Sequence, residues 1–283
     1  MLIQTTALTP RQSEEVTDLL HECETYDNAS ACVQMDHALN ADPGTDSWFL
    51  SYQGGELAGL ASVFAPSREE AEISLCVKPA LRKAGLGMQI LTQAADYLHS
   101  RGATVLLLVS DRKSETGCRM AARASRQIQH TEYSMQLARP FSGSTGNRVV
   151  IREASPADLP DFMKICNSAY GADDRDFDGF LRTSLSTRHR KGHIAYWNDQ
   201  PVACCFVGYH GDFVSINTVA VLEEVQGKGI GQEFLTAIIR LLEPENPVIQ
   251  LEVDSTNATA YRLYRKLGFV DLRAIDYHIL FRP

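Results

Sequence analysis

Apolar residues follow a helical spacing in two stretches of the chain, and the two stretches lie 144 residues apart (230 − 86). The first stretch has its apolar residues at Leu86, Ile90, Leu91, Ala94, Ala95 and Leu98, and the second at Ile230, Phe234, Leu235, Ile238, Ile239 and Leu242. Residues at such spacings lie on one face of an amphipathic helix. The pattern therefore predicts the same long helix twice, and it indicates two copies of one fold.

Each predicted helix lies between two segments in which apolar residues alternate with other residues. The alternating residues of the first copy and then of the second are Leu75, Val77, Val105, Leu107, Val109, Val219, Val221, Ile249, Leu251 and Val253. Alternation of this kind is typical of β-strands. A strand, a helix and a second strand in this order form a βαβ unit with parallel strands. We therefore expect each copy to be an α/β domain with a mixed sheet.

The rest of each copy predicts one shared order of elements before the βαβ unit. With the second copy in parentheses, these are a strand at 2–5 (149–152), a helix from Thr9-Pro10 (Ser155-Pro156), a helix at about 31–40 (176–186), and hairpin strands at 48–52 and 57–64 (194–197 and 202–208). Threonine and serine are favoured N-caps, and proline is favoured as the first helical residue. A further helix and a last strand follow the βαβ unit of each copy.

The segment between the two copies is rich in residues that interrupt helices and strands. It reads Arg139-Pro140-Phe141-Ser142-Gly143-Ser144-Thr145-Gly146-Asn147. Glycine, serine and proline at this density are typical of a linker. The sequence therefore predicts an N-terminal domain over residues 1–138, a linker over 139–147 and a C-terminal domain over 148–283.

Composition and charge narrow the class of protein. Of the 283 residues, 44% are hydrophobic and 22% charged, which is typical of a globular protein. The formal net charge of -8 argues against a nucleic-acid partner. No apolar run approaches the roughly 20 residues that cross a bilayer, and the N-terminus lacks the pattern of a signal peptide. Seven irregularly spaced cysteines fit a reducing compartment, so we expect a cytoplasmic protein without a membrane partner.

A glycine turn joins the first strand and the long helix of each βαβ unit. It reads Arg82-Lys83-Ala84-Gly85-Leu86-Gly87 in the first copy and Gln226-Gly227-Lys228-Gly229-Ile230-Gly231 in the second. Such a turn directs several backbone N–H groups to one place, and the helix N-terminus adds partial positive charge, so it suits a phosphate or pyrophosphate. Arg82, Lys83 and Lys228 could add side-chain charge. The turn alone is not specific, because it is neither a P-loop nor the dinucleotide-binding pattern.

The second copy carries a longer and more specific pattern. It consists of Val219-Ala220-Val221, Gln226-x-x-Gly229-x-Gly231, Leu251-Glu252-Val253 and Asn257-x-x-Ala260-x-x-Leu263-Tyr264-x-x-x-Gly268-Phe269. This pattern resembles the GNAT superfamily of acetyl-CoA-dependent N-acetyltransferases. The resemblance covers nearly the whole chain, because both copies share the turn and the order of elements. The chain thus looks like a tandem of two GNAT (acyl-CoA N-acyltransferase) domains.

The resemblance implies acetyl-CoA as the donor and assigns residues to it. They are Val219, Ala220, Val221, Gln226, Gly227, Lys228, Gly229, Ile230, Gly231, Asn257 and Tyr264. By this resemblance the turn binds the CoA pyrophosphate, and residues 219–221 accompany the pantetheine in a gap between two parallel strands. Asn257 is then near the pantetheine and Tyr264 near the thioester sulfur. Glu252 matches the general base of the branch that acetylates the N-termini of ribosomal proteins.

An amine acceptor sets two requirements for this chemistry. The amine is protonated at neutral pH, and it must lose a proton before its nitrogen attacks the thioester carbonyl directly. The CoA sulfur leaves more readily when it gains a proton, since a thiol pKa is about 8.5. Glu252 is the expected base and Tyr264 the expected acid. The plainer alternatives are a solvent-facing strand residue for Glu252, a core aromatic for Tyr264 and a helix N-cap for Asn257.

The first copy lacks this catalytic pair at the matching positions. Shifted by 144 residues, Glu252 falls on Leu108 and Tyr264 falls on Met120. The glycine turn is retained, and its candidate CoA ligands are Arg82, Lys83, Gly85 and Gly87. We therefore expect the first copy to be catalytically degenerate, as either a structural or a CoA-holding domain.

The sequence thus predicts an acyltransferase, a GNAT N-acetyltransferase that moves an acetyl group to a primary amine. The acceptor is either a small molecule or the N-terminal amine of a peptide or protein. The sequence does not decide between them, because the regions that select the acceptor carry no motif. The alternative from another class is a catalytically silent acyl-CoA-binding or regulatory module. The sequence also leaves open whether the transferred acyl group is longer than acetyl, and it does not indicate the oligomeric state. No pattern predicts a metal site.

Overall fold

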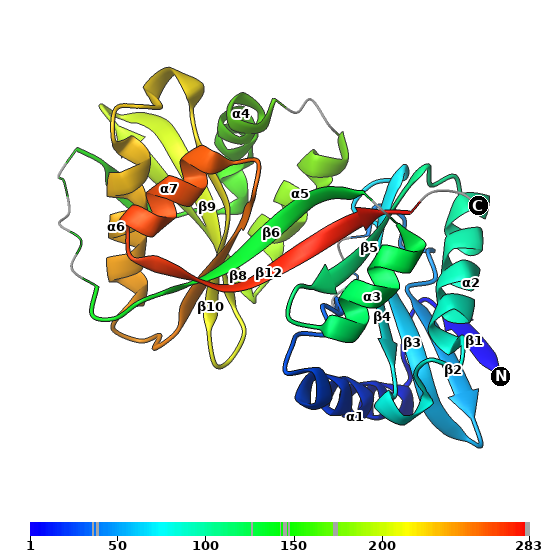
Figure 1. The fold of residues 1–283 in the computed structure, drawn as a ribbon. Coiled ribbons are helices and arrows are strands. Elements are labelled where there is room, and N and C mark those ends of the chain that lie inside the picture. The colour runs from blue at the N-terminus through cyan, green and yellow to red at the C-terminus, as the bar shows by residue number, and fades with distance from the viewer. Residues whose placement is uncertain are drawn as a thin grey trace. The chain divides into compact units, whose positions relative to one another are not determined.

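The computed structural model describes residues 1–35, 37, 40–125, 127–141, 143, 146, 148–171 and 175–280. They form two compact units, Met1–Glu132 with Arg273–Pro283 and Tyr133–Leu272, each with a sheet covered by helices (Figure 1). The predicted α/β class and the repeat are confirmed. Among the described residues, no helix has the length and apolar character to span a membrane, and no three His, Cys, Asp or Glu side chains group as a metal site requires.

The first unit has the predicted βαβ arrangement. Its elements are β1 (Leu2–Thr5), α1 (Pro10–Asp27), β2 (Trp48–Gln53), β3 (Glu56–Phe64), β4 (Glu70–Val77), the 3-10 turn η1 (Pro79–Leu81), α2 (Leu86–Ser100), β5 (Val105–Asp111), α3 (Glu115–Ala124) and parts of β6 (Ile128–Leu137) and β12 (Phe269–Ile279). The strands lie in the order β1-β2-β3-β4-β5-β12-β6. β4 and β5 are the expected parallel pair, and α2 connects them.

The second unit repeats this arrangement. Its elements, besides the other parts of β6 and β12, are β7 (Val150–Glu153), η2 (Pro156–Asp158), α4 (Leu159–Tyr170), α5 (Arg175–Ser186), β8 (Arg190–Trp197), β9 (Gln200–Tyr209), β10 (Val214–Val221), η3 (Glu223–Val225), α6 (Ile230–Leu242), β11 (Ile249–Asp254) and α7 (Ala258–Lys266). The strands lie in the order β12-β6-β11-β10-β9-β8-β7. Here β10 and β11 are the parallel pair, and α6 connects them.

Two strands cross the boundary between the units. β6 begins in the first unit and ends in the second, whereas β12 begins in the second unit and ends in the first. Residues Ile275–Ile279 of β12 pair antiparallel with Asp111–Leu107 of β5. The last strand of the chain therefore completes the sheet of the first unit. In this respect the compact units differ from the predicted halves 1–138 and 148–283.

Local sequence explains where several elements begin and turn. The Thr9 hydroxyl accepts a hydrogen bond from the Gln12 N–H at 3.3 Å, and the Gln12 side chain accepts one from the Thr9 N–H at 2.9 Å. This capping box, with proline next in the chain, begins α1 where predicted. Both hairpins turn through two residues of positive φ, Gly54-Gly55 and Asn198-Asp199, as type I′ turns require.

The helix predicted over residues 31–40 is wrong, because none of its described residues is helical. The backbone carbonyls of this segment bond to the sheet instead. Ser74 Oγ donates to the Cys32 carbonyl at 2.5 Å, and Ser62 Oγ donates to the Gln34 carbonyl at 2.9 Å. An α-helix would need such carbonyls for N–H groups four residues later. The corresponding helix of the second unit, α5, is present where predicted.

The helices of the second unit cover both faces of its sheet. On one face, α6 and α7 pack against Cys205, Ile216 and Leu251. On the other face, α4 and α5 pack against Cys204 and Ala220. Successive residues of a strand point to opposite faces, which is why Cys204 and Cys205 belong to different cores. We refer to these as the α6–α7 face and the α4–α5 face.

Candidate active site

Strands β10 and β11 run parallel for a short distance and then part. Their pairing covers Val214 to Ile216, opposite Ile249 to Leu251. β10 then continues to Val221 and β11 to Asp254, but no further register joins these described residues. A β-bulge between Asn217 and Ala220 turns β10 aside, and Thr218 within it has a φ of 51°. The two parallel strands thus separate at the carboxyl end of the βαβ unit.

The bulge also reverses the side-chain direction along β10. Ile216, before it, packs on the α6–α7 face, whereas Ala220, after it, packs on the α4–α5 face. In a regular strand, residues four apart lie on the same face. The extra residue of the bulge therefore turns Val219 and Val221 toward the α6–α7 face, where both pack, and Val221 also borders the core of the other face.

The turn after β10 has the backbone conformation that its glycines predict. Gly227 and Gly229 have φ values of 72° and 81°, a region that residues with a β-carbon rarely adopt. Helix α6 begins at Ile230 without a side-chain cap, so its first N–H groups have no partner within the helix. Gln226 Nε2 donates to the Val221 carbonyl at 3.0 Å and ties the turn to β10. This arrangement suits a phosphate group.

The first unit uses Arg82 for the same tie. Arg82 Nε donates to the Val77 carbonyl at 2.9 Å, which matches the bond made by Gln226 in the second unit. Its Nη1 also donates to Asp27 Oδ1 at 2.7 Å and to Thr116 Oγ1 at 2.8 Å. The side chains of Arg82 and Asp27 are only 14% and 13% exposed. The guanidinium charge is therefore balanced by Asp27, and Lys83 is the other predicted cation of this turn.

Tyr264 lies on α7, and the residue is only 6% exposed. Its ring packs in the α6–α7 core, edge-on to Phe269 with the ring centroids 6.1 Å apart. Within the part of the chain that the structure describes, its hydroxyl has no hydrogen-bond partner. Burial raises the pKa of this phenol, so the hydroxyl is protonated at neutral pH. Tyr264 thus carries a proton that none of the described residues accepts.

Glu252 lies on β11 and is exposed. Its neighbours Leu251 and Val253 are buried in the α6–α7 core, to which Tyr264 also belongs. Strand alternation therefore directs the Glu252 side chain to the opposite face of β11. The structure places Glu252 beyond the last residue of β11 that pairs with β10, and it directs Glu252 and Tyr264 to opposite faces of the strand.

The other two polar candidates of the second unit have structural contacts. Asn257 is the N-cap of α7, and its Oδ1 accepts the Ala260 N–H at 3.0 Å. The N-cap interpretation is thus confirmed, and the exposed Asn257 amide NH₂ is left to a second role. Lys228 Nζ lies 5.7 Å from the centre of the Trp197 ring, within the range of a cation–π contact.

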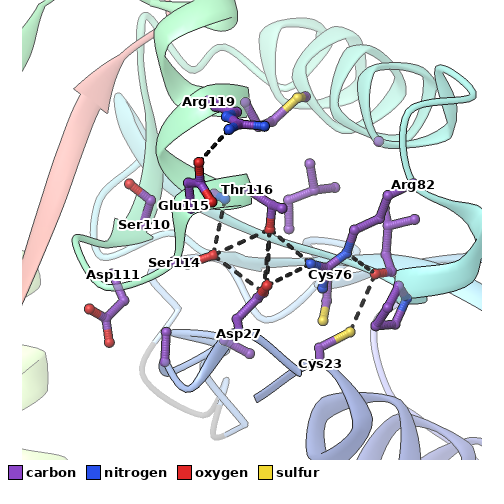
Figure 2. A pocket seen from close by; sticks show the side chains of 18 of the residues that line it. Cys23, Asp27, Cys76, Arg82, Ser110, Asp111, Ser114, Glu115, Thr116 and Arg119 are labelled. Atoms are coloured by element: carbon purple, nitrogen blue, oxygen red, sulfur yellow. Dashed lines mark hydrogen bonds and ion pairs between the residues drawn. The ribbon is translucent and has the colours of Figure 1, made fainter. Parts of the chain in front are cut away.

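A pocket of about 730 Å³ opens in the first unit, where β4 and β5 part (Figure 2). Its volume is typical of small-molecule sites, which are about 300–1,000 Å³. The predicted ligands of the first turn are in its lining, namely Arg82, Lys83, Gly85 and Gly87. Leu108 and Met120 line it as well, at the positions that match Glu252 and Tyr264.

A polar cluster forms one wall of this pocket. Figure 2 shows Asp27 between Arg82 and the start of α3, where the Asp27 carboxylate accepts hydrogen bonds from Thr116 at 3.2 Å and Ser114 at 3.3 Å. This cluster connects α1, the glycine turn and α3. Arg119, on the same helix, pairs with Glu115 at the pocket rim. Of the side chains that hold this wall together, the sequence analysis singled out Arg82 but not Asp27, Ser114 or Thr116.

Two further contacts at the second site were also missed. Tyr170, the last residue of α4, donates its hydroxyl to the Val219 carbonyl at 2.9 Å. Arg148 donates Nη1 to the Lys228 carbonyl at 2.9 Å. These partners are 49 and 80 residues apart in the sequence, respectively. Neither Tyr170 nor Arg148 belongs to a motif, so no local signal could have found them.

Both halves of the chain match the model of one family, described as the acetyltransferase (GNAT) family, over residues 13–123 and 157–269. The chain is 26% identical over 291 residues to the mycothiol acetyltransferase of Actinosynnema mirum, which covers 93% of this chain and 94% of that protein. Its fold is similar to that of a GCN5-related N-acetyltransferase from Sphaerobacter thermophilus, with a TM-score of 0.80, 19% identity and coverage of 100% and 96% of the two chains. A tandem GNAT protein from the clavulanic acid biosynthesis pathway gives a TM-score of 0.69 at 12% identity, covering 100% and 99%.

The two matched regions contain both glycine turns and both pairs of parallel strands described above. The expectation of two similar domains in tandem is therefore confirmed. Because the family model matches well over half of the chain, membership does not depend on any single relative. The chain belongs to the acetyltransferase (GNAT) family, as an acetyl-CoA-dependent N-acetyltransferase that carries the family domain twice.

Proposed function

We propose that the second copy is the catalytic one and that it transfers the acetyl group by direct attack of a primary amine on the thioester. The observation that carries the proposal is the parting of β10 and β11, with Glu252 beyond it and the proton-bearing Tyr264 on the helix that follows. The first copy has Leu108 and Met120 at the matching positions. Only the second copy thus has a carboxylate and a phenol at these places in the sequence.

Each residue then has a defined task. The N–H groups between Gln226 and Gly231 bind the pyrophosphate, and the pantetheine extends along β10 toward the parted strands. Glu252 takes a proton from the ammonium group, directly or through water, and the amine nitrogen attacks the carbonyl carbon. The C–S bond breaks as Tyr264 gives its proton to the sulfur, and the second proton that the nitrogen loses returns to the Tyr264 phenolate, directly or through water. Because the two side chains project to opposite faces of β11, the amine approaches from the α4–α5 face and the sulfur is protonated from the α6–α7 face.

The acceptor that we infer is a small-molecule primary amine. The support is the similarity, over 93% of this chain, to a protein that acts as a mycothiol acetyltransferase. The net charge of -8 also favours a cationic acceptor through long-range attraction. The N-terminal amine of a peptide is the alternative that the same chemistry permits.

Release of free CoA from acetyl-CoA tests the proposal against a panel of polyamines, aminoglycosides, amino acids and short peptides. We expect turnover with a small-molecule amine, and kcat/KM lower by about 10²-fold in Glu252→Gln at neutral pH. The deficit should shrink as the pH rises, because a free amine needs no base. If CoA binds but no amine reacts, the chain is an acyl-CoA-binding module. If only peptides react, the inferred acceptor class is wrong.

For the first copy we propose a different function, namely holding CoA or acyl-CoA without transferring the acyl group. The pocket of about 730 Å³ supports it, since the turn from Arg82 to Gly87 contributes to its lining. Leu108 and Met120 leave the matching positions without base or acid, so the bound thioester is not turned over. The silent CoA-binding module, which the sequence leaves open as an alternative for the entire chain, then applies to the first copy alone.

Substitution of valine for Gly87 or Gly231 distinguishes the CoA site of the first copy from that of the second. A β-carbon would lie 3.4 Å from the Leu75 Cδ2 atom at Gly87 and 3.4 Å from the Val221 Cγ2 atom at Gly231. Alanine therefore fits as a control, whereas the branches of valine push the turn away from the strand. In equilibrium titration we expect about two CoA per wild-type chain and about one per valine variant. Turnover is lost only in Gly231→Val, and equal loss in both variants contradicts catalysis by the second copy.

A further inference from the structure

We propose that Arg148 is a positioning residue for the donor and that it aims the Gly229 N–H at the phosphates of acetyl-CoA. This inference rests on the proposed function of the second copy. Arg148 is the first residue after the predicted linker and lies two residues before β7. Its Nη1 donates to the Lys228 carbonyl at 2.9 Å, across 80 residues of sequence. The contact therefore brings the start of the second copy onto the back of its glycine turn.

The bond acts on the peptide unit that joins Lys228 to Gly229. A trans peptide is planar, and its C=O and N–H groups point in opposite directions. A donor that holds the Lys228 carbonyl on one side of the turn therefore holds the Gly229 N–H on the other side. Gly229 is the N-cap of α6, so this N–H is one of the groups that a helix cannot satisfy internally. Its direction decides whether it meets a phosphate.

Arg148 is itself fixed by Glu233, in the first turn of α6. The Arg148 guanidinium forms an ion pair with Glu233, and the Arg148 backbone N–H donates to Glu233 Oε2 at 3.2 Å. The Glu233 side chain is only 13% exposed. Arg148 Nη2 also lies 3.1 Å from the place of a β-carbon at Gly229. The φ of 81° favours glycine at this position, and a β-carbon there would also crowd the arginine.

The first copy holds its turn differently. Shifted by 144 residues, Lys228 falls on Ala84 and Glu233 falls on Gln89. In the part of the chain that the structure describes, no side chain donates to the Ala84 carbonyl. The first turn is tied at its beginning by Arg82, whereas the second is held at its beginning by Gln226 and at its centre by Arg148. We infer that the second copy needs the additional hydrogen bond from Arg148 because it is the copy that binds acetyl-CoA for turnover.

Arg148→Met keeps the length of the side chain and removes its hydrogen-bond donors. We expect KM for acetyl-CoA to rise about tenfold with kcat unchanged, because one well-aimed hydrogen bond to a phosphate is lost. Acetyl-pantetheine, a donor without the pyrophosphate, should react equally well in wild type and variant. Arg152→Met is the matched control, since Arg152 is 46% exposed and pairs with Asp158 away from the turn. It should leave both donors unaffected.

The outcomes separate the inference from the proposed function. If Arg148→Met raises KM equally for both donors, or lowers kcat, the residue acts through the fold and the inference is wrong. If the wild-type protein transfers nothing from either donor, the proposed function fails. CoA titration in the Gly87→Val background then still decides the positioning role, because it measures the second site alone. A Kd that Arg148→Met leaves unchanged overturns the inference, and a rise of about tenfold supports it.

Discussion

Phenylalanine in place of Tyr264 is expected to lower kcat by about 10²-fold and to leave KM for acetyl-CoA unchanged. The phenol is the proposed donor to the departing sulfur, and the CoA phosphates bind elsewhere. The variant keeps the ring that packs edge-on to Phe269. Among the described residues the hydroxyl has no hydrogen-bond partner, so its removal does not lower the free energy of unfolding. Steady-state kinetics and thermal unfolding, measured on the same preparation, check both expectations.

Tyr261→Phe is the matched control, because it removes a phenol from the same helix. The Tyr261 hydroxyl donates to Asp271 Oδ2 at 2.9 Å, and its ring contacts Tyr133. We expect this control to lose about 1 kcal/mol of stability with the hydrogen bond and to keep its activity. The two variants are thus expected to show opposite effects. Tyr264→Phe loses activity but keeps its stability, whereas Tyr261→Phe loses stability but keeps its activity.

The pH dependence of the rate separates the acid from the base. Burial raises the pKa of Tyr264 above that of a free phenol, so the proposed acid keeps its proton beyond the pH at which the amine loses its own. The value of kcat/KM should therefore rise with pH and show no decline up to about pH 10. A rate that is the same in wild type and Tyr264→Phe across this range rules out the phenol as the acid.

The parts of the second site that depend on neighbours in sequence could be predicted. The turn from Gln226 to Gly231 follows from the φ freedom of glycine, and α7 begins at the cap that Asn257 provides. The structure adds why a glutamine or an arginine opens the turn. Gln226 and Arg82 each donate to the carbonyl five residues earlier, at 3.0 and 2.9 Å. Both side chains are long and end in N–H donors, and this shared property lets one replace the other.

The parts that depend on distant residues could not be predicted. The sequence predicts a helix over residues 31–40. It does not reveal that the hydroxyls of Ser62 and Ser74, which are distant in sequence, donate hydrogen bonds to the carbonyls of this segment. The crossing of β6 and β12 was hidden for another reason. Tyr133 and Tyr277 are matching residues of the two copies (277 − 133 = 144). Two strands with equivalent sequences carry no local information about which sheet each one completes.

Removal of residues 273–283 is expected to unfold the first unit and leave the second unit folded. The lost segment pairs Ile275–Ile279 with β5, and Tyr277 is only 8% exposed. Asp276, also buried, accepts hydrogen bonds from Arg112 at 2.8 Å and from Thr131 at 2.7 Å. Burial of a large apolar side chain stabilises by about 1.5–3 kcal/mol. Tyr277, the partly buried Ile275, Ile279 and Leu280, and the lost backbone pairing together approach the stability of a small domain, which is about 5–15 kcal/mol.

Hydrogen exchange read by mass spectrometry distinguishes the two units after truncation. In the truncated chain, amides of β3 and β4 should lose protection, whereas those of β9 and β10 should keep it. Deletion of residues 281–283 alone is the control and should change neither set, because the pairing with β5 ends at Ile279. By the same reasoning a fragment of residues 1–138 should not fold, although it contains the entire first copy as the sequence divides it. Full protection of β3 and β4 in the truncated chain would show that the first sheet is complete without its borrowed strand. The first copy then would not depend on the end of the second for its fold.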